Sequence, residues 1–141
     1  MAFLSASDRE AVRQRLQALS GPVRLVHFTQ TLACDTCPEA RALVEEVAAL
    51  SDQVTLQVLN FITDREEAAR LGVDKVPATV VLGAKEVPLR SYGVASGYEF
   101  ATLLEAMSLA ASGDSGLPAP VRARLAQVTD PIQLQVFVTP T

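Results

Sequence analysis

The chain of 141 residues contains only two cysteines, one histidine and no tryptophan. Two cysteines are too few for a disulfide framework, and without a second pair they are too few for a tetrahedral zinc site. The 12 Lys and Arg residues are outnumbered by 16 Asp and Glu residues, so no basic surface is expected that would bind a phosphate backbone. The sequence therefore predicts neither a metal ion nor a nucleic acid as a partner.

Long apolar runs are missing as well. No stretch approaches the roughly 18 apolar residues that span a bilayer, and the N-terminal MAFLSASDRE lacks the basic start and apolar centre of a signal peptide. We therefore predict a cytoplasmic protein without membrane contact. Its length corresponds to one domain with one core.

Short β-branched and aromatic runs alternate with helical patterns in the first 112 residues. The runs that predict strands are VRLVHFT (23–29), VTLQVLNF (54–61), ATVVLG (78–83) and VPLRSYG (87–93). A helical stripe begins at Cys37, and capping-box patterns predict three further helix starts, at the pairs Ser7 and Glu10, Thr63 and Glu66, and Ser96 and Glu99. This alternation predicts an α/β fold with a central mixed β-sheet flanked by helices.

The segment SGDSGLPAP (112–120) is rich in Gly, Pro and Ser and predicts a linker. After it, residues 121–137 repeat residues 12–28 at an offset of 109, with seven identities in seventeen ungapped pairs. We therefore predict a domain over residues 1–112, a linker over 113–120, and the opening helix and first strand of a second unit over 121–141. At the same offset, the Cys34 position falls two residues beyond Thr141.

Three explanations remain open for a chain that stops just before this second cysteine position. They are an engineered truncation, a nonsense or frameshift mutation, and a UGA codon that the organism reads as selenocysteine. The segment IQLQVFV (132–138) has the composition of a strand but no second sheet of its own to join. We expect it to cause self-association, for example a homodimer formed through this strand.

The sequence ACDTCPEA places Cys34 and Cys37 between a predicted strand and a predicted helix. This spacing allows the two sulfurs to meet across the first helical turn and is typical of thiol redox chemistry. Free amides and the helix dipole would stabilise a Cys34 thiolate, the attacking species, whereas Cys37 lies on the buried stripe and would attack second. Asp35 opposes the dipole, and we expect a moderately reducing pair.

His27 and Pro77 are the other candidate site residues. Two interpretations of His27 remain open: a core histidine bonded to a neighbour, or a group that exchanges a proton with Cys37, since imidazole titrates near neutral pH. Pro77 begins a predicted strand, so it lies at an edge or in a special turn. Because cis bonds are rare even before proline, the sequence alone predicts a trans peptide between Val76 and Pro77.

With Cys34, Cys37 and Pro77 in these positions, the chain resembles the thioredoxin superfamily. LVHFTQTLACDTC, DKVPATVV and SYGVASGYEF look like the N-terminal unit of the glutaredoxin-like protein disulfide oxidoreductases, which contain two tandem thioredoxin folds. The chain is similar, more distantly, to the tandem module that passes electrons to peroxiredoxins in alkyl hydroperoxide reductase systems. The resemblance implies that Cys34 attacks, Cys37 resolves, and Val76 and a cis Pro77 hold the substrate chain by backbone contacts.

We therefore predict a thioredoxin-like thiol–disulfide oxidoreductase that reduces or exchanges protein disulfides. It needs no bound cofactor beyond the redox-active pair of Cys34 and Cys37. The expected partners are protein disulfides, together with a flavoprotein similar to thioredoxin reductase or a peroxiredoxin. Two alternatives remain open: an electron-relay module for a peroxiredoxin system, and a redox-inactive module for docking or dimerisation.

Overall fold

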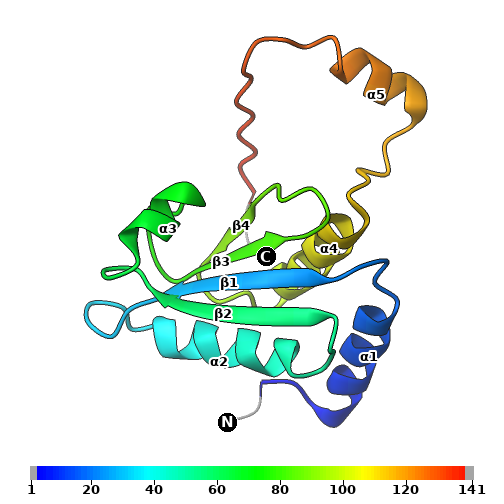
Figure 1. Cartoon of the computed structure of the whole chain (residues 1–141). Helices are drawn as coiled ribbons and strands as arrows, with labels where there is room; N and C mark the ends of the chain where they lie inside the picture. The colour runs from blue at the N-terminus through cyan, green and yellow to red at the C-terminus, as the bar shows by residue number, and fades with distance from the viewer. Residues whose placement is uncertain (1–2, 139–141) are drawn as a thin grey trace.

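The computed structural model describes residues 3–138 and contains a four-stranded sheet with helices packed on it (Figure 1). The elements are α1 (Ala6–Gln17), β1 (Val23–Thr29), α2 (Cys37–Ala48), β2 (Val54–Asn60), α3 (Arg65–Arg70), β3 (Ala78–Leu82), β4 (Leu89–Tyr92), α4 (Tyr98–Ser112) and α5 (Ala119–Leu125). Among the helices of this part of the chain, none is both long enough and apolar enough to cross a membrane.

The sheet has the order β2-β1-β3-β4 and mixes parallel and antiparallel pairs. β1 and β2 run parallel and are joined through α2, whereas β1 with β3 and β3 with β4 are antiparallel. The predicted mixed α/β fold of thioredoxin type is therefore confirmed. In this register His27 on β1 lies between Val58 on β2 and Thr79 on β3.

The sheet separates two hydrophobic cores (Figure 1). The larger core joins one sheet face to α1, α2 and α4, and its members include Leu16, Leu25, Leu43, Val47, Val81, Leu103 and Met107. The smaller core lies on the other face beneath α3 and includes Val26, Phe28, Ala68, Leu71, Val80 and Leu82. Full burial of such a side chain contributes about 1.5–3 kcal/mol. Because β1 is buried on both faces, it gives a firm support to the loop that follows it.

None of the three predicted capping boxes forms. α1 begins after Ser5, whose hydroxyl accepts from the Asp8 amide at 3.1 Å while the Asp8 carboxylate accepts from the Ser5 amide at 3.3 Å. The capping box therefore lies two residues earlier than predicted. α3 and α4 begin after Asp64 and Gly97, and neither of these N-cap residues makes a side-chain cap bond. Sequence spacing alone did not distinguish between neighbouring polar residues.

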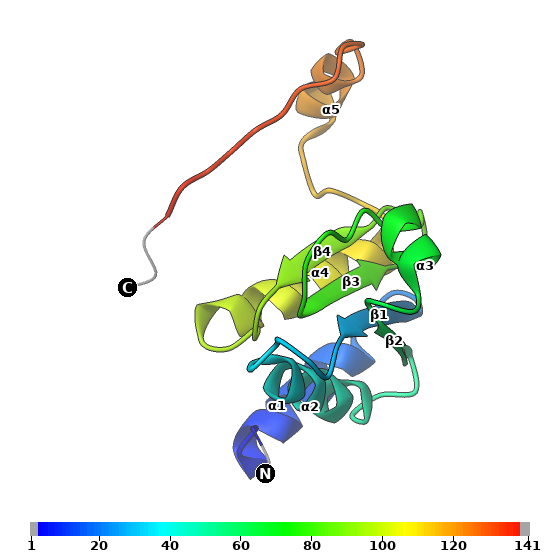
Figure 2. The ribbon, with the colours of Figure 1, turned by 90° about the vertical axis from the view of Figure 1, so that its left-hand side faces the viewer.

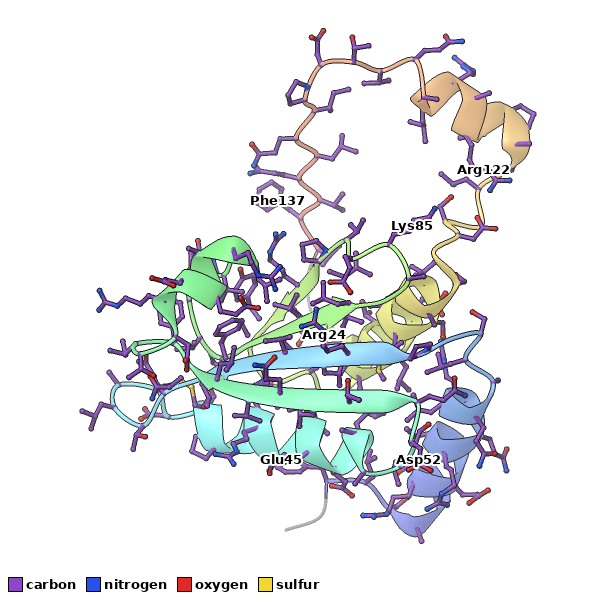
Figure 3. The ribbon with its side chains drawn as sticks, viewed as in Figure 1. Arg24, Glu45, Asp52, Lys85, Arg122 and Phe137 are labelled. Atoms are coloured by element: carbon purple, nitrogen blue, oxygen red, sulfur yellow. A yellow bond between two sulfur atoms is a disulfide. The ribbon has the colours of Figure 1, made fainter. Side chains whose placement is uncertain are left out.

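The segment after α4 has no part in either core. α5 has no buried residue, and residues 131–138 form no strand and are exposed along their length (Figures 1 and 2). Its apolar residues match buried ones of the first repeat: Leu25 and Phe28 are 0% exposed, whereas Leu134 and Phe137 are 87% and 89% exposed (Figure 3). The assignment of 121–141 to a second unit stays a prediction, and positions 139–141 lie outside the described residues.

Candidate active site

One end of the sheet brings together the two segments that carry Cys34, Cys37, Val76 and Pro77. Cys34 and Cys37 follow the carboxyl end of β1, while Val76 and Pro77 precede the amino end of β3. Because β1 and β3 are antiparallel with Phe28 opposite Ala78, these two ends lie side by side. Figure 2 views the molecule from this end of the sheet, with the start of α2 and the loop before it toward the viewer.

The two cysteines form a disulfide, with 5.4 Å between their Cα atoms. They differ in exposure: Cys34 is half-buried, whereas Cys37, the first residue of α2, is 0% exposed. Within residues 3–138 the backbone amides of Asp35, Thr36 and Cys37 donate no hydrogen bond, as expected for the first amides of a helix. These amides and the dipole of α2 give the sulfur of Cys34 a surrounding that favours negative charge.

The peptide between Val76 and Pro77 is cis, in contrast to the trans form predicted from the sequence alone. The Pro77 carbonyl accepts from the Gly93 amide at 2.9 Å, so the turn after β4 is tied to this segment. Neither backbone group of Val76 has a hydrogen-bond partner in the described part of the chain. Next to it, the ammonium of Lys75 lies 4.9 Å from the centre of the Tyr92 ring.

His27 is completely buried beneath the cysteines' helix. It shares the sheet face of Val23 and Leu25, the face on which α2 packs. Its Nδ1 lies 3.0 Å from the Thr79 hydroxyl, and no partner for its Nε2 is found among residues 3–138. Burial lowers the pKa of His27 from 6.5 to about 4, because the imidazolium loses its hydration; the positive charge of Arg41 lowers it further and Glu45 partly compensates. The ring is therefore neutral at physiological pH.

A cleft of about 480 Å³ opens on the β2 side of the cysteines. Gln30, Pro38, Val58 and the ion pair of Arg41 with Glu45, joined at 2.7 Å, are among the residues that line it. Figure 3 shows Glu45 on the outer side of α2. Val58, which lines the cleft, is the direct partner of His27 in the register of β1 and β2.

Two residues of this region were not identified from the sequence. Thr79 is the one polar residue within the apolar strand ATVVL, and this contrast was a usable signal for a buried hydrogen bond. Gln30 donates to two backbone carbonyls of the loop before Cys34, and a single glutamine after a strand carries no signal of such a role. The predicted roles of Cys34, Cys37, Val76, Pro77 and His27 remain predictions.

The structure thus defines a thioredoxin-like domain in which a Cys-x-x-Cys disulfide stands at the start of a helix, beside a cis-proline loop. A family model described as a thioredoxin domain matches residues 25–105, and the chain belongs to this family. The family and fold predicted from the sequence are therefore confirmed.

Solved structures with the same fold include two redox proteins. The alkylhydroperoxide reductase component AhpF from Enterococcus faecalis, solved as a mutant, is similar with a TM-score of 0.78 and 22% identity, over 89% of this chain and 61% of that one. A protein disulfide oxidoreductase from Aeropyrum pernix K1 has a TM-score of 0.78 and 23% identity, over 90% of this chain and 56% of that one. This chain therefore spans less than two thirds of either protein, and no curated protein matches its sequence.

Proposed function

We propose that this protein is a thiol–disulfide oxidoreductase that reduces or exchanges disulfides of other proteins through Cys34 and Cys37. The observation that carries the proposal is the asymmetry of the pair. One sulfur is half-buried at the start of a helix, where the dipole and free amides favour a thiolate, and the other belongs to a fully buried residue. A cysteine pair with no redox function would need neither an accessible sulfur at a helix start nor a second, buried cysteine beside it.

The reaction begins with the dithiol form of the protein. The thiolate of Cys34 attacks one sulfur of a substrate disulfide, forms a mixed disulfide and expels the other substrate sulfur as a thiolate. Cys37 then loses its proton and attacks the sulfur of Cys34, which releases the second substrate thiolate and closes the Cys34–Cys37 disulfide. The substrate gains two electrons, and the protein pair loses them.

The backbone of Val76 is the proposed contact for the substrate chain. Its unpartnered amide and carbonyl can pair with an extended segment, in the way that a strand is added to an exposed sheet edge. The Pro77 carbonyl is already bonded to Gly93, so Val76 offers the free groups of this turn. Such contacts recognise backbone rather than side chains, which suits a protein that acts on disulfides in different sequences.

His27 is the proposed acceptor of the Cys37 proton. Both residues are completely buried, and His27 lies on the sheet face that α2 covers. When Nδ1 carries the ring proton, it donates to the Thr79 hydroxyl and leaves the lone pair of Nε2 free. A neutral imidazole can then accept the thiol proton as Cys37 attacks and return it in the reverse reaction.

Regenerating the dithiol requires two electrons from a donor outside this chain. The similarity to an alkylhydroperoxide reductase component supports a reductase as the donor, and we propose a flavoprotein similar to thioredoxin reductase. The same similarity supports a narrower form of the proposal, in which the domain relays electrons to a peroxiredoxin. The cysteine chemistry is the same in both forms, and only the final acceptor differs.

The experiment that tests the proposal equilibrates the purified protein in thiol/disulfide buffers of defined potential and quantifies the free thiols by alkylation and mass. A reversible two-electron transition, together with reduction of a protein disulfide that Cys34→Ser abolishes, is the expected result. If neither is seen, the domain is a redox-inactive docking module.

A further inference from the structure

We propose that Gln30 is a positioning residue that fixes the loop before Cys34 and thereby raises the reactivity of the Cys34 thiolate. The inference rests on the proposed function, because it concerns the same sulfur. Gln30 follows directly after the last residue of β1, a strand buried in the centre of the sheet. The backbone of Gln30 is therefore held by β1, and its side chain extends along the loop that leads to Cys34.

The carboxamide of Gln30 bonds to two successive carbonyl groups of this loop. Its Nε2 donates to the Leu32 oxygen at 2.7 Å and to the Ala33 oxygen at 3.4 Å. Both partners are acceptors, so the amino end of the carboxamide has to face them. The Leu32 side chain is 82% exposed and provides no packing that would hold the loop in its place.

These two carbonyls belong to the two peptide planes on either side of the Ala33 Cα. Fixing both planes fixes the backbone dihedral angles of Ala33, and Ala33 has a φ of 55°. That left-handed conformation is disfavoured for a residue with a Cβ and is common only for glycine. The two hydrogen bonds from the Gln30 carboxamide therefore stabilise a backbone conformation of Ala33 that is unfavourable for an alanine by itself.

The second of these peptide planes contains the amide nitrogen of Cys34. Its orientation decides where the Cys34 sulfur lies relative to the free amides of Asp35, Thr36 and Cys37. In the oxidised protein the disulfide also holds this geometry. In the dithiol that covalent link is absent, so the contribution of Gln30 should appear in the reduced form, where the thiolate needs the amides.

The test compares Gln30→Met, which keeps the length of the side chain and removes the donor, with Gln57→Met as a matched control. Gln57 is exposed on β2, and its side chain makes no hydrogen bond within the described residues. For each protein, the rate of Cys34 alkylation is measured against pH, the redox equilibrium constant is measured against a reference thiol couple, and the melting temperature of the oxidised form is recorded.

We expect Gln30→Met to raise the pKa of the Cys34 thiol and to slow its alkylation at pH 7 about three- to tenfold. The constant for reduction of the disulfide should fall by a similar factor, which corresponds to a potential about 14–30 mV more negative. The oxidised form should melt at nearly the same temperature as the unsubstituted protein. Gln57→Met should change none of these quantities.

A second substitution examines the role of the Ala33 conformation. Glycine adopts a positive φ without the steric cost, so adding Ala33→Gly to Gln30→Met should restore part of the lost reactivity. Gln30→Glu, which places an acceptor against the two carbonyls, should be slower than Gln30→Met. Recovery of this kind is not expected if Gln30 serves only general stability.

The outcomes separate the two proposals. A normal redox transition with equal reactivity in Gln30→Met and Gln57→Met would overturn the positioning role and leave the proposed function intact. A loss of reactivity that follows a lower melting temperature and that Ala33→Gly does not relieve would overturn it as well. If the unsubstituted protein shows no redox transition, the proposed function fails and the positioning role fails with it.

Discussion

The Nδ1 atom of His27 lies 3.0 Å from the hydroxyl oxygen of Thr79, its direct partner across β1 and β3. The two residues are the only buried polar or charged residues of the described chain, and their bond sets the orientation of the imidazole ring. The other ring nitrogen, Nε2, has no partner in that part of the chain. Because burial lowers the pKa of His27, this residue makes the stability of the fold depend on pH.

We expect the protein to become less stable as the pH falls from about 6.5 toward about 4. The pKa of His27 is lowered to about 4 in the folded protein and is near 6.5 when unfolded, so between these values the unfolded chain binds more protons. Stability therefore rises with pH across this window and is lost on acidification, by roughly 3 kcal/mol in total. Urea unfolding between pH 4 and 8 measures this slope.

The double variant His27→Leu/Thr79→Val is the control for the pH effect. It removes the titrating ring and also the hydroxyl that a single His27→Leu change would leave buried without its partner. The slope of stability between pH 4 and 6.5 should become clearly shallower in this variant. An unchanged slope would show that His27 is not the group responsible.

Proton exchange by His27 should appear in the kinetics of disulfide reduction. If Nε2 accepts the Cys37 proton, His27→Leu should slow release of the substrate from its mixed disulfide at least tenfold near neutral pH, since positioned proton acceptors contribute about 10²–10⁴-fold. The pH dependence of reduction should also change shape. An identical pH profile in wild type and His27→Leu would rule out this role.

The charge of Asp35 should make the pair more reducing. Asp35 follows Cys34 directly in the chain and lies just before α2, where a negative charge favours the thiol over the thiolate. Asp35→Asn should therefore raise the potential, on the order of 10–20 mV for an exposed charge near a helix end. Equilibration with glutathione measures the shift, and Asp52→Asn, at an exposed position before β2, is the control. A lower potential for Asp35→Asn would contradict the prediction.

Gly83 should tolerate no side chain. A Cβ atom at this position would lie 2.0 Å from the backbone oxygen of Ala110, where the end of β3 meets α4. The backbone of α4 would have to move, so Gly83→Ala should destabilise the protein by about 2–4 kcal/mol in chemical denaturation. Gly116→Ala is the comparison, because a Cβ there meets nothing within 4 Å and only its φ of 70° is unfavourable. Equal losses in the two variants would contradict the steric explanation.

The exposed C-terminal segment should make this chain self-associate. Leu134 and Phe137 are 87% and 89% exposed on an extended segment. In the sheet that the described residues form, β4 is an outer strand, and a further strand could join it there. We expect the mass measured by light scattering to rise with concentration, and the double variant Leu134→Lys/Phe137→Lys to reduce this rise. Gln133→Lys/Gln135→Lys adds the same charge to the same segment and is the control. A monomer at high concentration would contradict this prediction.

The sequence by itself determined the order of strands and helices over the first 112 residues and the place of the redox pair. VRLVHFT was predicted as a strand with the bounds that β1 has, because a central strand consists of β-branched and aromatic residues that any local window detects. Cys34 and Cys37 were identified because their spacing is a property of the chain itself. The burial of Cys37 followed from helical periodicity, which is equally local.

The tertiary structure decided what depends on residues far apart in the chain. Thr79 became the partner of His27 across 52 residues because of the β1–β3 register, which no local pattern specifies. Some local features also had close alternatives that the sequence did not separate: α1 is capped by Ser5 rather than Ser7, and Gln30 bonds to carbonyls two and three residues further on. Propensity and periodicity choose the elements, but packing against distant neighbours chooses among conformations of nearly equal local energy.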